Sequence, residues 1–103
     1  MKKATKSPYK EDEIQIAKVA KALGHPARLA ILRHLTETNE CCCSEIVKNL
    51  PIAQATVSQH LKVLKEAGLI KGTISPPKVC YCINRKNWAS SKILFENFMT
   101  LRH

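Results

Sequence analysis

Residues 54–70 read QATVSQHLKVLKEAGLI, and this stretch decides the fold. Its apolar residues recur at helical spacing, and the glycine near its end supplies a helix stop. We therefore expect a helix that begins near Ala53, after a short turn, and ends at Gly68. The residues expected to face the protein interior are Val57, Leu61 and Leu64.

The opposite face of this helix carries small and polar side chains, because each residue is rotated by about 100° from the last. A glutamine can bind adenine through two hydrogen bonds, a serine or threonine can reach a base or a phosphate, and an alanine allows close approach. The face therefore suits the major groove of DNA, although an ordinary solvated helix face shows the same periodicity. The residues predicted to contact DNA are Gln54, Thr56, Ser58, Gln59, His60 and Lys62.

The neighbouring segments complete an α+β domain that is mostly helical. In chain order the expected elements are helices at 11–23 and 26–38, a short strand at 41–43, helices at 44–50 and 53–68, strands at 69–75 and 79–83, and a helix at 87–101. This order predicts a winged helix-turn-helix with about five helices and a β-hairpin wing. Lys71 and Lys78 in the hairpin are expected to add phosphate contacts beside the groove-reading helix.

Apolar stripes predict which faces of the first two helices are buried. The stripe expected in the first helix is Ile16, Ala20 and Leu23, and the one in the second is Leu29, Leu32 and Leu35 with Ile31.

Length and charge narrow the class of protein. The 103 residues suit one domain with one core. Lys and Arg number 17 against 8 acidic residues, a net charge of +9, which favours a polyanionic partner and nucleic acid first. Residues 1–10 predict a flexible basic arm, and 11–103 a DNA-binding and dimerisation domain. No apolar run of about 18 residues and no signal-peptide pattern occurs, which favours a cytoplasmic protein.

Three segments carry a family resemblance. They are ALGHPARLAILRHL at 22–35, SEIVKNL at 44–50 and QATVSQHLKVLKEAGLI at 54–70. In this order, followed by a wing and a last helix, they resemble the ArsR/SmtB winged-helix repressors over roughly residues 12–98. The resemblance implies a homodimer, built from the first and last helices, that binds operator DNA and releases it when an inducer binds.

The last predicted helix supports a dimer independently. It contains Trp88, Phe95, Phe98 and Met99, more large apolar side chains than a small surface helix needs. A two-fold dimer presents two recognition helices about one DNA turn apart, so the operator is expected to be an inverted repeat.

The five cysteines form two groups, an arrangement unlike the disulfide scaffold of a secreted protein. In metal sensors of the resembled family, a Cys-x-Cys pair opens the third helix. Here the alignment places Cys42 at the first position and Ser44 at the second, so the motif is broken. The last helix also lacks the Asp-x-His and His-x-x-Glu pairs of the family's other metal sites.

The topology suggests a different thiol site, because the short strand of a winged helix usually pairs with the second wing strand. Thiolates there can bind Zn²⁺, Cu⁺ or arsenite, or two can oxidise to a disulfide. Alternatively, the cysteines are small apolar residues of a partly buried sheet. A thiolate-bound metal or metalloid, a redox or persulfide-type switch and simple packing all stay open for Cys41, Cys42, Cys43, Cys80 and Cys82.

The histidines do not predict a metal site. His25, in the segment GHPAR, is expected to cap or pack at a helix start, whereas His34 and His60 have no partner at ligand spacing. An enzyme is also not expected, because the chain has no Cys-x-x-Cys at a helix start, no phosphate-binding glycine loop and no paired carboxylates. The alternatives that remain are a repressor without small-molecule sensing and a winged helix that binds protein or RNA.

Overall fold

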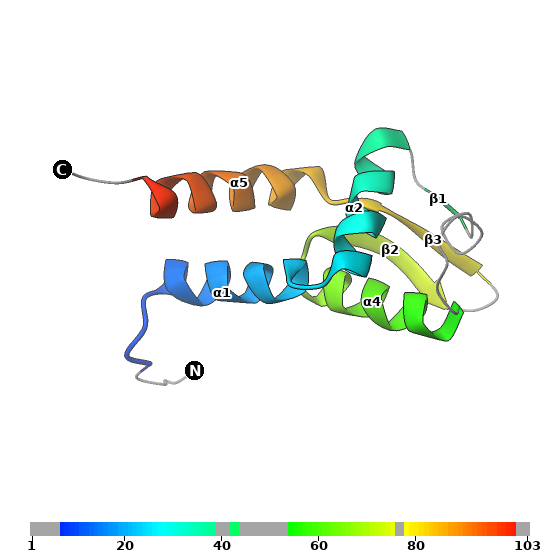
Figure 1. Cartoon of the computed structure of the whole chain (residues 1–103), viewed down its shortest axis with the longest axis horizontal. Helices are drawn as coiled ribbons and strands as arrows, with labels where there is room; N and C mark the ends of the chain where they lie inside the picture. The colour runs from blue at the N-terminus through cyan, green and yellow to red at the C-terminus, as the bar shows by residue number, and fades with distance from the viewer. Residues whose placement is uncertain (1–6, 39–41, 44–53, 76–77, 101–103) are drawn as a thin grey trace.

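The computed structural model describes residues 7–38, 42–43, 54–75 and 78–100. Its elements are α1 (Glu11–Leu23), α2 (Pro26–Thr38), β1 (Cys42–Cys43), α4 (Gln54–Glu66), β2 (Ile70–Ser75), β3 (Lys78–Ile83) and α5 (Arg85–Met99). The helix predicted at 44–50 lies outside the described residues. Figure 1 shows α1 and α5 extending together at one end of the molecule, with α2, α4 and the sheet at the other. The predicted winged helix-turn-helix is confirmed.

Local capping explains where α4 ends and where α5 begins. The α4 helix closes in a Schellman motif, in which Leu69 N–H donates to the Leu64 carbonyl at 3.1 Å and Gly68 N–H to the Lys65 carbonyl at 2.9 Å. Gly68 permits this turn because its φ is +82°. The α5 helix starts two residues before the predicted 87, because Asn87 N–H donates to the side chain of Asn84 at 3.1 Å.

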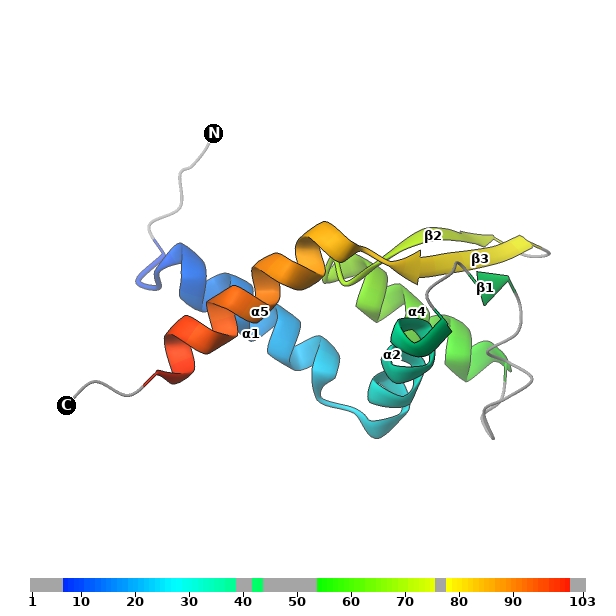
Figure 2. The ribbon, with the colours of Figure 1, turned by 90° about the horizontal axis from the view of Figure 1, so that it is seen from above.

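The three strands form an antiparallel sheet in the order β1-β3-β2. The pairing of β1 with the second wing strand is therefore confirmed. Its register sets Cys42 opposite Tyr81 and Cys43 opposite Cys80. The hairpin formed by β2 and β3 is the wing (Figure 2).

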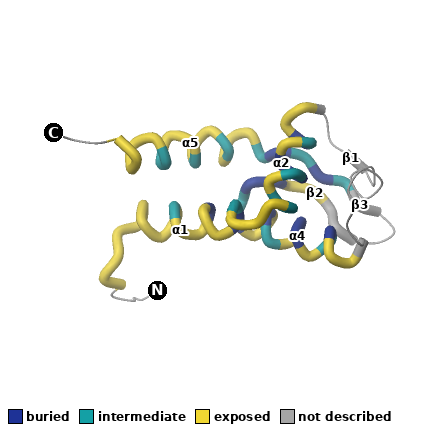
Figure 3. Tube along the Cα trace, viewed as in Figure 1, coloured by how far each residue is buried: buried dark blue, intermediate teal, exposed yellow. Residues whose placement is uncertain are grey.

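The core lies where the inner end of α1 meets α2, α4 and the root of the wing (Figure 3). Tyr81 and Ile83 of β3 contribute to the core. So do Leu69, which directly precedes β2, and Ile70, the first residue of β2. The residues buried in α2 are Ile31, Leu32 and Leu35.

Two predicted stripes are corrected by the structure. The buried residues of α1 are Val19 and Ala22, whereas the predicted Ala20 is exposed and Ile16 and Leu23 are only half-buried. The buried face of α1 differs from the predicted one because α1 packs against two helices, α2 and α5. In α2, Leu29 is 50% exposed, since it lies about half a turn from Ile31.

The α5 helix has no fully buried residue. Only its half-buried Trp88 and Phe95 pack against the core, while Ile93, Phe98 and Met99 are exposed. Figure 2 shows α5 crossing α1, so these two helices extend beyond the core that anchors them.

We predict that Gly72→Ala destabilises the protein by about 1–3 kcal/mol, measured by urea unfolding. Gly72 has a φ of +136°, and a Cβ there would lie 2.6 Å from Tyr81 Cα and closer still to the Cys80 carbonyl oxygen. Gly24→Ala is the control, because Gly24 has a φ of −83° and its nearest obstacle is the Lys21 carbonyl oxygen at 3.3 Å. Equal losses in both variants would contradict the prediction.

Candidate nucleic-acid interface

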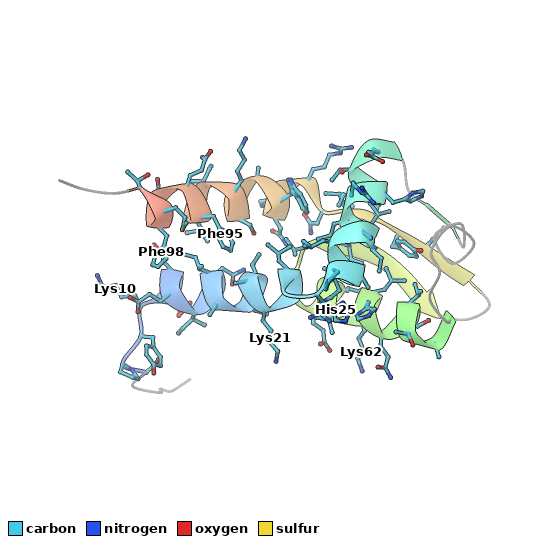
Figure 4. The ribbon with its side chains drawn as sticks, viewed as in Figure 1. Lys10, Lys21, His25, Lys62, Phe95 and Phe98 are labelled. Carbon is cyan, nitrogen blue, oxygen red and sulfur yellow. The ribbon has the colours of Figure 1, made fainter. Side chains whose placement is uncertain are left out.

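The outward face of α4 has the composition that the sequence predicts. Val57, Leu61 and Leu64 are buried to 1% exposure or less, which confirms the inward stripe. Ser58 is half-buried, and the exposed residues of the face are Ala55, Thr56, Gln59, Lys62 and Glu66. Figure 4 shows the Lys62 side chain directed away from the body of the protein. The side chain of Gln54, a predicted DNA contact, lies outside the described residues.

His60 differs from the other predicted DNA contacts. Only 8% of its surface is exposed, and its ring lies 4.5 Å from the ring of His25. The sequence predicts His60 as a DNA contact, whereas the structure buries its side chain on the flank of the inward stripe, next to Leu61. The polar neighbours of the His60 ring are His25 and Arg28. The ring therefore contacts α2 and is not presented to solvent.

The guanidinium of Arg28 links three helices at this point. Its Nε donates to the Ala22 carbonyl at 2.7 Å and its Nη2 to the Lys21 carbonyl at 3.2 Å, at the end of α1. Its Nη1 lies 3.2 Å from Nδ1 of His60 in α4. Because an arginine only donates, His60 Nδ1 must accept, and the proton of the neutral ring is on Nε2. Sequence reasoning gave Arg28 no role, although it lies in the segment GHPAR.

His25 caps the start of α2, as the sequence predicts. Its Nδ1 accepts a hydrogen bond from Ala27 N–H at 3.0 Å. Figure 4 places His25 where the start of α2 meets α4. His25, Arg28 and His60 therefore form one polar cluster, which we call the histidine–arginine cluster, beneath the exposed face of α4.

This cluster lowers the pKa of His60 below its ordinary value of 6.5. Burial is the largest cause, and the nearby His25 and the positive charge of Arg28 add to it. A proton on Nδ1 would also replace the acceptor of the Arg28 hydrogen bond with a second donor. The folded protein therefore favours a neutral His60.

The wing is attached directly to α4. Lys65 Nζ in α4 donates to the Gly72 carbonyl in β2 at 2.6 Å, and α4 packs against β2. The neighbouring Lys71, a predicted DNA contact, is exposed. Lys65 and Lys71 thus place positive charge where α4 meets the wing, and Lys62 adds charge on the exposed face of α4. The side chain of Lys78 lies outside the described residues.

The cysteines of β3 are half-buried, and Cys80 and Cys82 are both disulfide-bonded. Cys41 and the side chains of Cys42 and Cys43 lie outside the described residues. Among the side chains that are described, no group of three or more His, Cys, Asp or Glu residues is placed to hold a metal ion. The thiolate-bound metal or metalloid stays a prediction.

Comparisons with known proteins agree with this geometry. The family model described as "Bacterial regulatory protein, arsR family" matches residues 25–71. Over 55 residues the chain is 44% identical to an uncharacterized HTH-type transcriptional regulator, MJ1325, of Methanocaldococcus jannaschii, covering 53% of this chain and 62% of that one. Over 61 residues it is 44% identical to the HTH-type transcriptional repressor SmtB of Mycobacterium tuberculosis, covering 59% of this chain and 44% of the repressor.

The chain therefore spans less than two thirds of the length of these relatives. A solved structure with a similar fold is that of the ArsR family transcriptional regulator RHA00566, with a TM-score of 0.70, 19% identity, and coverage of 89% of this chain and 91% of that one. These relatives are transcriptional regulators and not enzymes. In the described part of the chain, no helix is long and apolar enough to cross a membrane.

We predict that the free energy of unfolding falls as the pH drops below 6.5 and levels off below the lowered pKa of folded His60. In that window the unfolded chain binds the proton that the folded protein resists, so acid favours unfolding. Urea unfolding across a pH series measures the effect. In His60→Gln, an amide oxygen still accepts from Arg28 but does not titrate, so this part of the pH dependence should disappear. An unchanged slope in the variant would contradict the assignment.

Proposed function

We propose that this chain, whose residues 25–71 belong to the ArsR family, is a homodimeric repressor that binds an inverted repeat in operator DNA and releases it when an inducer binds. The observation that carries the proposal is the exposed face of α4, which combines Thr56, Gln59 and Lys62 on a helix fixed to the core. In this proposal the face enters the major groove, where Gln59 reads bases and Lys62 contacts phosphate.

Electrostatics supports DNA as the partner. The net charge of +9 favours any polyanion, and Lys62, Lys65 and Lys71 concentrate part of it beside the reading face. With the wing attached to α4 through Lys65, phosphate contacts from Lys71 and Lys78 fall next to the groove that α4 enters. We also propose that residues 1–10 form a flexible basic arm. The protein is proposed to act in the cytoplasm.

The exposed apolar residues of α1 and α5 support a homodimer. Ile14 is 41% exposed, Ile93 55%, Phe98 63% and Met99 69%. Figure 4 shows Phe95 and Phe98 on the side of α5 that faces α1. Large apolar side chains gathered on two adjacent helices are typical of a protein interface. A second copy of the chain, related by a two-fold axis, would cover both helices and set two α4 helices on one DNA face.

We also propose that the inducer acts through the cysteine thiols of β1 and β3. The described pairing of β1 with β3 and the bonding state of Cys80 and Cys82 support this choice. An inducer must bind or modify the form that fits DNA less well, since only differential affinity shifts the equilibrium.

Selection of binding sites from a random duplex pool tests the proposal with the reduced, full-length chain. We expect the selected sites to share an inverted repeat, bound much more tightly than random duplex and with an affinity that falls steeply with salt. Tight binding without sequence preference, or preference for RNA or for a protein, would overturn it.

We predict different losses from two substitutions on the α4 face. Gln59→Ala should reduce the preference for the selected site over single-base variants by about 1–3 kcal/mol, because a base contact is lost. Lys62→Ala should weaken binding to all duplexes and lower the slope of affinity against salt by about one. Fluorescence anisotropy measures both, and Lys92→Ala on α5 is the charge-matched control. A loss in Lys92→Ala equal to that in Lys62→Ala would contradict the assigned surface.

We predict that Phe98→Asp weakens dimerisation by about 2 kcal/mol or more, because a charge replaces an aromatic group in the proposed interface. Analytical ultracentrifugation over a concentration series measures the change. Leu29→Asp is the matched control, since Leu29 is 50% exposed but lies on α2. A Phe98→Asp dimer as stable as the unsubstituted one would exclude this face of α5.

A further inference from the structure

We propose that Cys43 and Cys80 form a reversible disulfide between β1 and the wing, that a hydroperoxide drives its formation, and that the bond lowers the affinity of the protein for DNA. The proposal rests on the DNA-binding function proposed above and specifies its regulation. It assigns the sensing chemistry to thiol oxidation and not to a bound metal.

The backbone register selects the pair. Cys80 is disulfide-bonded, and Cys43 lies directly opposite it in the antiparallel ladder. Directly opposed residues have Cα atoms about 4.5–5.5 Å apart, which lies inside the range of about 4.4–6.8 Å that a disulfide requires. A bond between Cys80 and Cys82 would instead join residues two apart on one strand, about 6.6 Å, at the upper limit of that range.

The faces of β3 agree with this assignment. Tyr81 is 1% exposed and points into the core, so Cys80 and Cys82 point to the opposite face of the sheet. Both are half-buried, which leaves them accessible to a molecule as small as a hydroperoxide. Cys42 is opposite Tyr81 in the register and therefore is not opposed to either cysteine of β3.

The chemistry balances with the hydroperoxide as the oxidant. One thiolate attacks the peroxide oxygen, which breaks the O–O bond, gives a sulfenic acid and releases water or an alcohol. The second thiolate attacks the sulfenic sulfur, which forms the S–S bond and releases water. Two electrons and two protons leave the thiol pair and reduce the peroxide. A dithiol reverses the bond by thiol–disulfide exchange.

The position of the bond explains its effect on DNA binding. Along the chain, β1 lies between α2 and the recognition helix α4, while β3 is the strand of the wing that packs against α2. A covalent link between β1 and β3 therefore restricts the wing relative to the segment that leads into α4. Because α4 and the wing must both fit one DNA duplex, this restriction favours the conformation that binds DNA less well.

Counting free thiols in two matched variants tests, without DNA, whether Cys43 and Cys80 form a disulfide. One full-length variant keeps only Cys43 and Cys80, and the control keeps only Cys42 and Cys80, with every other cysteine changed to serine. After reduction and one equivalent of hydrogen peroxide, the first should lose both free thiols without forming a covalent dimer. The control should retain its thiols. Equal loss in the two variants, or loss only in the control, would overturn the assignment.

Anisotropy with a selected DNA site tests the regulation. Oxidation should weaken binding by the wild-type protein on the order of tenfold, within the usual range of allosteric coupling, and a dithiol should restore it. The variant that keeps only Cys43 and Cys80 should respond to the oxidant in the same way, and a further Cys80→Ser change in it should abolish the response. A bond that forms without changing the affinity would overturn the regulatory role. If the reduced protein itself selects no DNA site, the proposed function fails, while the thiol count still decides whether the Cys43–Cys80 bond exists.

Discussion

The guanidinium of Arg28 joins the end of α1 to α4, the helix that we propose reads DNA. Two of its hydrogen bonds reach carbonyl groups at the end of α1: that of Ala22, and that of Lys21, which also accepts from Gly24 N–H. The third reaches His60 in α4. A positive charge held in this way must have acceptors around it, so the neutral state of His60 is part of the same constraint. The Arg28 side chain thus adds a polar contact to the orientation of α4, which Val57, Leu61 and Leu64 set in the core.

The apolar surface of α1 and α5 follows from the small size of this core. A chain of 103 residues cannot surround all of its helices with other elements, and α5 reaches the core only through Trp88 and Phe95. The same helix leaves Phe98 63% exposed. Leaving so much apolar surface in water is unfavourable, and the proposed homodimer would remove that cost. Dimerisation would thus complete the structure as well as match the symmetry of an operator.

The sequence predicts α4 well because its apolar spacing is regular and its glycine stop is unambiguous. It predicts the buried faces of α1 less well, since Val19 and Ala22 are selected by two simultaneous packing partners and not by a single period. The sequence predicts His60 as a DNA contact, whereas in the structure its buried ring pairs with Arg28, which is 32 positions away in the sequence. Long-range polar pairs of this kind leave no periodic signal in a single sequence.

The two elements that we propose to contact DNA, α4 and the wing, are held by different bonds, and the proposed regulation depends on this separation. Lys65 ties α4 to β2 at Gly72, while the pairing of β1 ties the chain ahead of α4 to β3. The wing is therefore attached to α4 through β2 and to β1 through β3. Neither attachment involves Val57, Leu61 or Leu64, which hold α4 in the core. The proposed regulation therefore acts at the edge of the sheet, while the core residues of α4 maintain the fold.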